Sequence, residues 1–251
     1  MKRRVIAFDL DNTLADSKSP ITEQMADLLD RLLRRVQVCV ISGGKFEQFE
    51  EQVLKNLKAG PRTLAALHIM PTCGTRYFRF DVTAEVWQQV YAEDLTAEQR
   101  AMIIAALDKG ADAVGYRATK LWGTQIEDRG SQVTFSALGQ EAPVASKQAW
   151  DPEGTKKRKL RDYVAKLIPE FEVRVGGSTS IDVTKPGIDK AYGIKKLIEL
   201  LSVTKKDVMF VGDRLSKGGN DYPVKAMGVD CVEVSRWQDT ALVIQTILDV
   251  T

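Results

Sequence analysis

The sequence is poor in the residues that build many enzyme sites. Its 251 residues include one histidine, His68, and three cysteines, Cys39, Cys73 and Cys231. A single histidine argues against histidine-based triads and zinc sites, and leaves acid–base chemistry to carboxylates. The cysteines are far apart and odd in number, which indicates free thiols in a reducing cytoplasm. We therefore expect a cytoplasmic protein.

The chain also lacks long apolar segments and a large excess of one charge. No segment reaches the roughly 18 consecutive apolar residues that a membrane helix needs. The 36 basic and 34 acidic residues give a net charge of +2, which is too small to indicate a nucleic-acid partner. The basic run at 156–161 begins a helical pattern, so we expect it to be a solvated helix face. No membrane and no nucleic acid is expected as a partner.

An acidic pair follows an apolar run near the start of the chain. Residues 5–8 are typical of a buried strand, and Asp9 and Asp11 come directly after it. Open α/β sheets bind ligands at the carboxyl ends of their strands. Two carboxylates held this close repel each other unless a cation lies between them, and oxygen ligands favour Mg²⁺. The pair therefore predicts a Mg²⁺ site, although by itself it is also compatible with a solvated turn.

A second acidic strand end lies in the C-terminal half. Residues 207–211 form an apolar run that ends in Gly212-Asp213, and Gly218-Gly219-Asn220-Asp221 follows. Glycines allow a backbone to fold tightly around an ion. Two acidic strand ends at one sheet edge are harder to explain as turns than one. Asp213, Asn220 and Asp221 thus join the candidate site.

Two less specific motifs add further candidate site residues. Residues 38–41 form a third strand that ends in Ser42-Gly43-Gly44, whose hydroxyl and glycine amides suit a phosphate oxygen. Lys190 lies in the first turn of a helix with apolar positions at the 3.6-residue period. A cation is unfavourable there because of the helix dipole. Lys190 is therefore either a surface residue or a partner for an anion.

These motifs resemble those of the haloacid dehalogenase superfamily of phosphotransferases. The matching residues are Asp9-x-Asp11-x-Thr13, Ser42, Lys190 and Gly212-Asp213 with Gly218-Gly219-Asn220-Asp221. Within that superfamily the chain is similar to eukaryotic-type phosphomannomutases over nearly its whole length. Segments 123–129, 176–183 and 189–192 carry this closer resemblance.

The resemblance implies a mechanism. Asp9 is then the nucleophile that forms an aspartyl-phosphate, and Asp11 is the general acid and base. Mg²⁺ is held by Asp9, Asp213 and the backbone carbonyl of Asp11, with Asp221 close by. Ser42 and Lys190 bind phosphate oxygens, and Asn220 or Asp221 orients Lys190.

The chain departs from the mutases where they hold a second phosphate. Arg129 matches one of their arginines, whereas Gln140 replaces another, Trp122 stands in a basic position, and Lys18 replaces an arginine near the nucleophile. The expected substrate-binding residues are Thr13, Lys18, Gly43, Lys120, Arg129, Gln140, Ser180, Asp182 and Asn220. With fewer arginines, a bisphosphorylated sugar would be held less well.

The pattern of elements predicts an α/β fold: a doubly wound parallel-sheet core with an inserted α+β cap. Residues 1–83 and 186–251 are expected to form the core, and residues 84–185 the cap. Expected helices include one that starts at Ser19-Pro20, one after the capping box at Thr96, and one over 155–168. Expected cap strands include 114–117, 125–128, 132–135 and 171–175. A homodimer through the cap is a further expectation.

Three functions remain open from the sequence. We favour a Mg²⁺-dependent phosphatase acting on a small sugar phosphate. A hexose-phosphate mutase is the alternative. A non-enzymatic phosphoacceptor or sugar-phosphate sensor is the third, although such receivers lack a cap and are about half this length.

Overall fold

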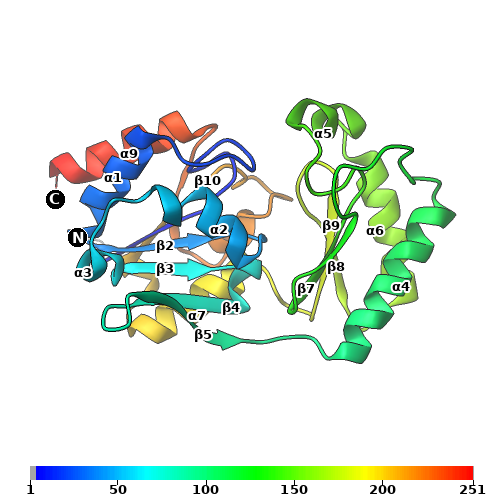
Figure 1. The fold of residues 1–251 in the computed structure, drawn as a ribbon, viewed down its shortest axis with the longest axis horizontal. Helices are drawn as coiled ribbons and strands as arrows, with labels where there is room; N and C mark the ends of the chain where they lie inside the picture. The colour runs from blue at the N-terminus through cyan, green and yellow to red at the C-terminus, as the bar shows by residue number, and fades with distance from the viewer. Residues whose placement is uncertain (1–3, 251) are drawn as a thin grey trace. The chain divides into compact units, whose positions relative to one another are not determined.

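The chain forms two units, each with its own hydrophobic core. The computed structural model describes residues 4–250. One unit, here called the core unit, runs to Ala92 and resumes at Asp189. The other, the inserted unit, is Glu93–Ile188 (Figure 1). The boundary at Ala92 lies beyond the expected residue 83 because the strand β5 (Val86–Ala92) pairs with β4 (Arg76–Asp81) in the core sheet.

The core unit is built on a seven-stranded sheet. Besides β4 and β5, its strands are β1 (Val5–Phe8), β2 (Gln37–Ile41), β3 (Leu67–Met70), β10 (Val208–Gly212) and β11 (Asp230–Glu233). Their order is β11-β10-β1-β2-β3-β4-β5. The first five are parallel neighbours, and β4 and β5 are antiparallel. The acidic ends of β1 and β10 are therefore adjacent.

Helices cover both faces of this sheet. Ile6 and Phe8 of β1 lie in a core with α1 (Glu23–Leu33) and α9 (Trp237–Val250), whereas Val5 and Ala7 lie in a second core with α7 (Lys190–Leu201). The alternation follows from the two-residue period of a strand. The shorter helical segments are α2 (Phe46–Gln52), η1 (Leu54–Asn56), α3 (Pro61–Leu64), η2 (Thr72–Gly74), η3 (Lys205–Asp207) and α8 (Tyr222–Ala226). The doubly wound α/β class is confirmed.

The first helix starts later than expected. It begins at Glu23, with Thr22 as its N-cap, and the Thr22 hydroxyl accepts a hydrogen bond from the Met25 amide. The amide of Ile21 donates instead to the carbonyl of Gln52, 2.8 Å away. The prediction of a start at Ser19-Pro20 is wrong because this long-range bond holds the segment outside the helix.

The inserted unit combines an antiparallel sheet with helices. Its strands are β6 (Ile126–Asp128), β7 (Gln132–Ser136), β9 (Ser180–Thr184) and β8 (Glu172–Val175), in the order β6-β7-β9-β8. Its helices are α4 (Ala97–Ala113), α5 (Val144–Trp150) and α6 (Thr155–Leu167). Val133, Phe135 and Ile181 pack in one core with α4 and α6. The expected capping box forms between Thr96 and Gln99.

One expected strand of this unit is absent. Val114 is the C-cap of α4, and no strand forms at 114–117. Arg117 instead binds Asp108 and Asp112 of α4 through ion pairs of 2.6 Å each. These contacts fold the segment back onto the helix, so it pairs with no strand. Among residues 4–250, no helix is long and apolar enough to cross a membrane.

Candidate active site

Three carboxylates meet at the carboxyl edge of the core sheet. Asp9 follows β1 and Asp213 follows β10, and the Asp9 amide donates to the Val211 carbonyl at 2.9 Å. Asp221 reaches the same place from the loop before α8. One oxygen from each of Asp9, Asp213 and Asp221 lies within 4.8 Å of the others. The sheet order thus brings together groups that are about 200 residues apart in sequence.

Glycines allow the loop that carries Asp221 to close. A Cβ on Gly212 would lie 2.5 Å from Asp221 Oδ2, and one on Gly219 would lie 2.1 Å from the Arg214 carbonyl oxygen. The Arg214 amide donates to the same Asp221 oxygen at 3.0 Å. Side chains at these two glycines would push the loop away from the carboxylates.

Lys190 is the buried cation of this cluster. It is the first residue of α7, after the N-cap Asp189, and its side chain is 1% exposed. Its Nζ lies 2.5 Å from Asp9 Oδ1 and 2.5 Å from Asp221 Oδ1. Burial lowers the pKa of Lys190, but the carboxylates of Asp9 and Asp221 outweigh it and raise that pKa above its usual range. Lys190 is therefore a charged partner for anions and not a surface residue.

The cluster carries surplus negative charge. Burial raises the pKa of Asp9 well above its usual range; Lys190 opposes this, and Asp221 and Asp213 add to it. Burial and then Asp221 also raise the pKa of Asp213. Three carboxylates facing one lysine would be relieved by a divalent cation, and an all-oxygen donor set is what Mg²⁺ prefers. The residues present fit a Mg²⁺ ion.

Neighbouring side chains hold the carboxylates in place. The Thr13 hydroxyl donates to Asp9 Oδ2 at 3.5 Å, and the side-chain NH₂ group of Asn12 donates to Asp213 Oδ2 at 3.5 Å. Asn12 has a φ of 63°, a left-handed conformation that asparagine tolerates. Asn220 is exposed, and it is Asp221 that contacts Lys190.

Ser42 and Gly43 lie at the end of β2, the strand next to β1. Ser42 is buried, and its hydroxyl oxygen accepts a hydrogen bond from the Gly44 amide at 3.3 Å. Gly43 is half-buried. The hydroxyl and the glycine turn thus stand at the same edge of the sheet as Asp9.

Asp11 has a different set of partners. Its carboxylate is not a member of the three-carboxylate cluster; it accepts hydrogen bonds from the side chains of Gln48 and Gln52 and from the backbone amide of Lys18. The sequence reasoning missed both glutamines. Their spacing of four residues on α2, directly after Ser42-Gly43-Gly44, was the available signal, since such residues share one helix face.

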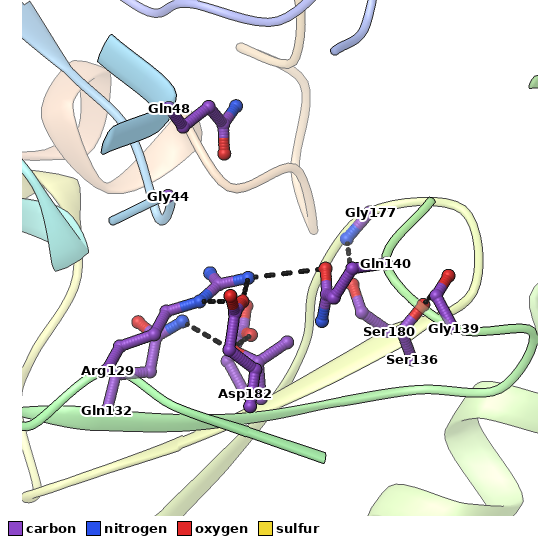
Figure 2. Close-up of polar contacts among 12 residues, drawn as sticks. Gly44, Gln48, Arg129, Gln132, Ser136, Gly139, Gln140, Gly177, Ser180 and Asp182 are labelled. Carbon is purple, nitrogen blue, oxygen red and sulfur yellow. Dashed lines mark hydrogen bonds and ion pairs between the residues drawn. The ribbon is translucent and has the colours of Figure 1, made fainter. Parts of the chain in front are cut away.

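In the inserted unit, Arg129 is already paired. The buried guanidinium binds one oxygen of Glu127, with Nε at 2.8 Å and an Nη at 2.7 Å, and donates to Gln140 Oε1 at 3.4 Å (Figure 2). Arg129 and Gln140, both expected in a substrate site, therefore lie together. Glu127 was not expected there. Its carboxylate offsets the charge of Arg129.

Two other expected residues of this unit, Ser180 and Asp182, lie on β9, and Lys120 lies in the segment between α4 and β6. Thr134 and Asp182 are paired across β7 and β9, and the Thr134 hydroxyl donates to Asp182 at 2.7 Å. The Gly177 amide donates to the Ser180 hydroxyl at 2.8 Å (Figure 2). Lys120 is exposed, with its Nζ 4.7 Å from the centre of the Trp122 ring.

Comparison with known proteins agrees with this arrangement. The model of the haloacid dehalogenase-like hydrolases matches residues 6–223, a span that contains every carboxylate of the cluster. The chain belongs to the haloacid dehalogenase-like hydrolase family. The family expected from the motifs is thereby confirmed.

Curated relatives of this haloacid dehalogenase-like protein include mutases. Phosphomannomutase 1 of Homo sapiens is 27% identical over 90% of this chain and 84% of its own length. The phosphomannomutase of Encephalitozoon cuniculi is 24% identical over 89% of this chain and 84% of its own length. The protein is therefore an enzyme, with hydrolase and mutase chemistry both represented among its relatives.

Solved structures share the fold at low sequence identity. An IMP-bound IMP-nucleotidase of Plasmodium falciparum has a TM-score of 0.75 at 16% identity, with 100% of this chain and 68% of that chain covered. A haloacid dehalogenase-like hydrolase from Bacteroides thetaiotaomicron has a TM-score of 0.64 at 15% identity, with 100% of both chains covered.

Proposed function

We propose that this enzyme is a Mg²⁺-dependent phosphatase that acts on a small sugar phosphate through an aspartyl-phosphate. The observation that carries the proposal is the contact of Lys190 with both Asp9 and Asp221, beside Asp213. Phosphoryl transfer depends mainly on positioning and on charge stabilisation. A buried lysine and three carboxylates suit both the metal and the transferring group.

In the first step a carboxylate oxygen of Asp9 bonds to phosphorus, and the bond between phosphorus and the sugar oxygen breaks. Asp11 gives its proton to that leaving oxygen. In the second step a water oxygen bonds to phosphorus while Asp11 takes a proton from that water. The bond between phosphorus and the Asp9 oxygen breaks, which regenerates the Asp9 carboxylate and releases inorganic phosphate. Ser42, the Gly43 amide and Lys190 hold the phosphate oxygens. Asp9, Asp213 and the backbone carbonyl of Asp11, with Asp221 close by, would hold Mg²⁺, which would neutralise the negative charge of the transferring phosphate.

The ion pair between Arg129 and Glu127 favours a phosphatase over a mutase. A mutase holds a sugar with two phosphates, so its distal site needs free positive charge. Here Glu127 binds the guanidinium of Arg129 on one side, and Gln140 contributes no charge. We therefore propose a substrate with one phosphate, whose hydroxyl groups are bound by polar residues such as Ser180 and Asp182.

Mutase activity is the second candidate. It is favoured by the phosphomannomutases among the relatives, which match the chain over about nine tenths of its length. Both candidates use the same aspartyl-phosphate. They differ in whether water or a sugar hydroxyl accepts the phosphoryl group.

A panel of hexose 1- and 6-phosphates with Mg²⁺ distinguishes the two. Free phosphate and sugar-phosphate isomers should be measured together, with and without a hexose bisphosphate. We expect free phosphate to exceed isomerised product under both conditions, and Asp9→Asn to abolish both. Quantitative isomerisation with little free phosphate would make the enzyme a mutase. Turnover above one tenth of wild type in Asp9→Asn would exclude the covalent route.

A further inference from the structure

The carboxylate of Asp11 is enclosed by donors from two segments of the core unit. Its Oδ1 accepts from the backbone amide of Lys18 at 2.7 Å and from Gln52 Nε2 at 3.3 Å. Its Oδ2 accepts from Gln48 Nε2 at 3.1 Å. Both oxygens are thus engaged, which restricts rotation of a side chain whose residue lies outside the named strands and forms an isolated bridge with Ala15.

A cation determines which way the Gln48 amide faces. The ammonium group of Lys18 has only donors, and it lies 2.7 Å from Gln48 Oε1. The NH₂ group of Gln48 must therefore face away from Lys18, and its two hydrogens are used by Asp11 and by Gln52 Oε1 at 2.6 Å. The chain of contacts runs from Lys18 through Gln48 to Asp11.

Gln52 is held just as completely. It is 3% exposed, and its NH₂ group is shared between Asp11 and the carbonyl of Ser19, 2.8 Å away. Its oxygen accepts from Gln48. A buried amide with every group satisfied has one stable orientation, since turning it over would place donor against donor.

Room for Gln48 comes from Gly44, the residue before the N-cap of its helix, Lys45. A Cβ on Gly44 would lie 2.2 Å from Gln48 Oε1 (both residues are drawn in Figure 2). The obstructing atom is the end of a flexible side chain, so a methyl group at this position would displace the Gln48 amide and leave the backbone in place.

We infer that Gln48 and Gln52 are positioning residues that aim the Asp11 carboxyl group at the leaving oxygen of the substrate. The inference rests on the proposed function, in which Asp11 protonates that oxygen. Proton transfer requires a fixed donor geometry, and a misplacement of about 1 Å is enough to cost a large part of the rate. Lys18 then acts through Gln48 and not by contact with the substrate.

The test compares two substrates that differ in their need for a proton. A hexose 6-phosphate has a poor alkoxide leaving group that requires protonation, whereas the leaving group of p-nitrophenyl phosphate departs as a stable anion. Gln48→Met and Gln52→Met keep the length of the side chain and remove its donors. We expect kcat/KM on the sugar phosphate to fall by about tenfold or more, part of the 10²–10⁴ that general acids contribute. On the aryl phosphate we expect kcat/KM to change by less than about twofold, because kcat/KM reports only the first step, in which this leaving group needs no proton.

Two further variants repeat the test while leaving both glutamines in place. Lys18→Met alters an exposed side chain and releases the orientation of Gln48, and Gly44→Ala displaces Gln48 by contact. Both should show the same selective loss on the sugar phosphate, with an unchanged melting temperature. Gln245→Met, on α9 with contacts to Arg31 and Asp249, is the matched control and should leave both rates unchanged.

The variant Asp11→Asn distinguishes a failure of the positioning role from a failure of the proposed function. Equal loss of kcat/KM on both substrates in Asp11→Asn would overturn Asp11 as the acid, and with it the proposed function. A selective loss in Asp11→Asn together with equal losses in Gln48→Met and Gln52→Met would overturn the positioning role alone. In the Asp11→Asn background, adding Gln48→Met should cost no further rate on the sugar phosphate.

Discussion

Gly193 of α7 lies directly against the backbone of Cys73 in η2. A Cβ on Gly193 would fall 2.6 Å from the Cys73 carbonyl oxygen and 2.4 Å from Ile41 Cδ1. The adjacent Gly74 would in turn place a Cβ 2.5 Å from Gly193 Cα. Lys190 stands one turn earlier on the same helix. This close approach of two backbones therefore sets how far Lys190 reaches toward Asp9.

Gly193→Ala should reduce both stability and activity. The methyl group meets a backbone oxygen that cannot turn aside, so α7 must shift, at a cost of about 1–3 kcal/mol in the free energy of unfolding. Urea unfolding and phosphate release measure the two effects. Gly60→Ala is the control, because no atom lies within 4 Å of a Cβ on Gly60. Unchanged stability in Gly193→Ala would contradict the prediction, because it would mean that α7 accommodates the methyl group without strain.

Removal of one carboxylate should change the response to Mg²⁺. Asp213→Asn takes away a ligand oxygen charge, so the Mg²⁺ concentration for half-maximal activity should rise at least tenfold. In EDTA the same variant should unfold at an equal or higher temperature than the wild type, because it relieves repulsion from Asp9 and Asp221. Thermal melts with and without Mg²⁺ check this. Full activity of EDTA-treated wild type would contradict the metal assignment.

His68 should make the core unit less stable in acid. It is buried, with Nδ1 2.7 Å from the Tyr77 hydroxyl and Nε2 2.8 Å from Gln37 Oε1. Burial, followed by repulsion from Arg79, lowers the pKa of His68 from 6.5 to about 4. Between those values the unfolded chain binds the extra proton, so the free energy of unfolding falls as pH drops from 6.5 to 4.

The loss across this window should reach about 3 kcal/mol, from roughly 1.4 kcal/mol for each pKa unit. His68→Gln retains a donor and an acceptor but does not titrate there. Urea unfolding of both proteins at pH 7 and pH 4.5 isolates the histidine, because the carboxylates contribute equally to each. An identical fall in stability in the variant would exclude His68 as its source.

Gln140→Arg should restore affinity for a second phosphate. The new guanidinium would stand beside Arg129, whose own charge is offset by Glu127. We expect a hexose bisphosphate to inhibit phosphate release about tenfold more strongly, which corresponds to about 1.4 kcal/mol, and the share of isomerised product to rise. Gln88→Arg, an exposed position on β5, carries the same charge change as a control. Equal effects of the two variants would mean that Gln140 is not at the distal site.

Much of the core of the site could be predicted because its signals are local. An apolar run followed by Asp9 or Asp213 marks the end of a buried strand, and strand ends in a parallel sheet meet at one edge. The 3.6-residue pattern placed Lys190 at the start of its helix. These features depend on residues adjacent in sequence, so no long-range contact was needed to find them.

Residues that are neighbours in the chain were thus enough to predict the α/β class, the family and the carboxylates Asp9 and Asp213 that meet at the sheet edge. The groups around the site became visible only in the folded chain: Gln48 and Gln52 hold Asp11, Glu127 offsets Arg129, and β5 extends the core sheet to Ala92. Hydrogen bonds and ion pairs between distant segments leave no periodic mark in the chain. These contacts depend on how the helices and strands pack, so they can be identified only from the folded structure.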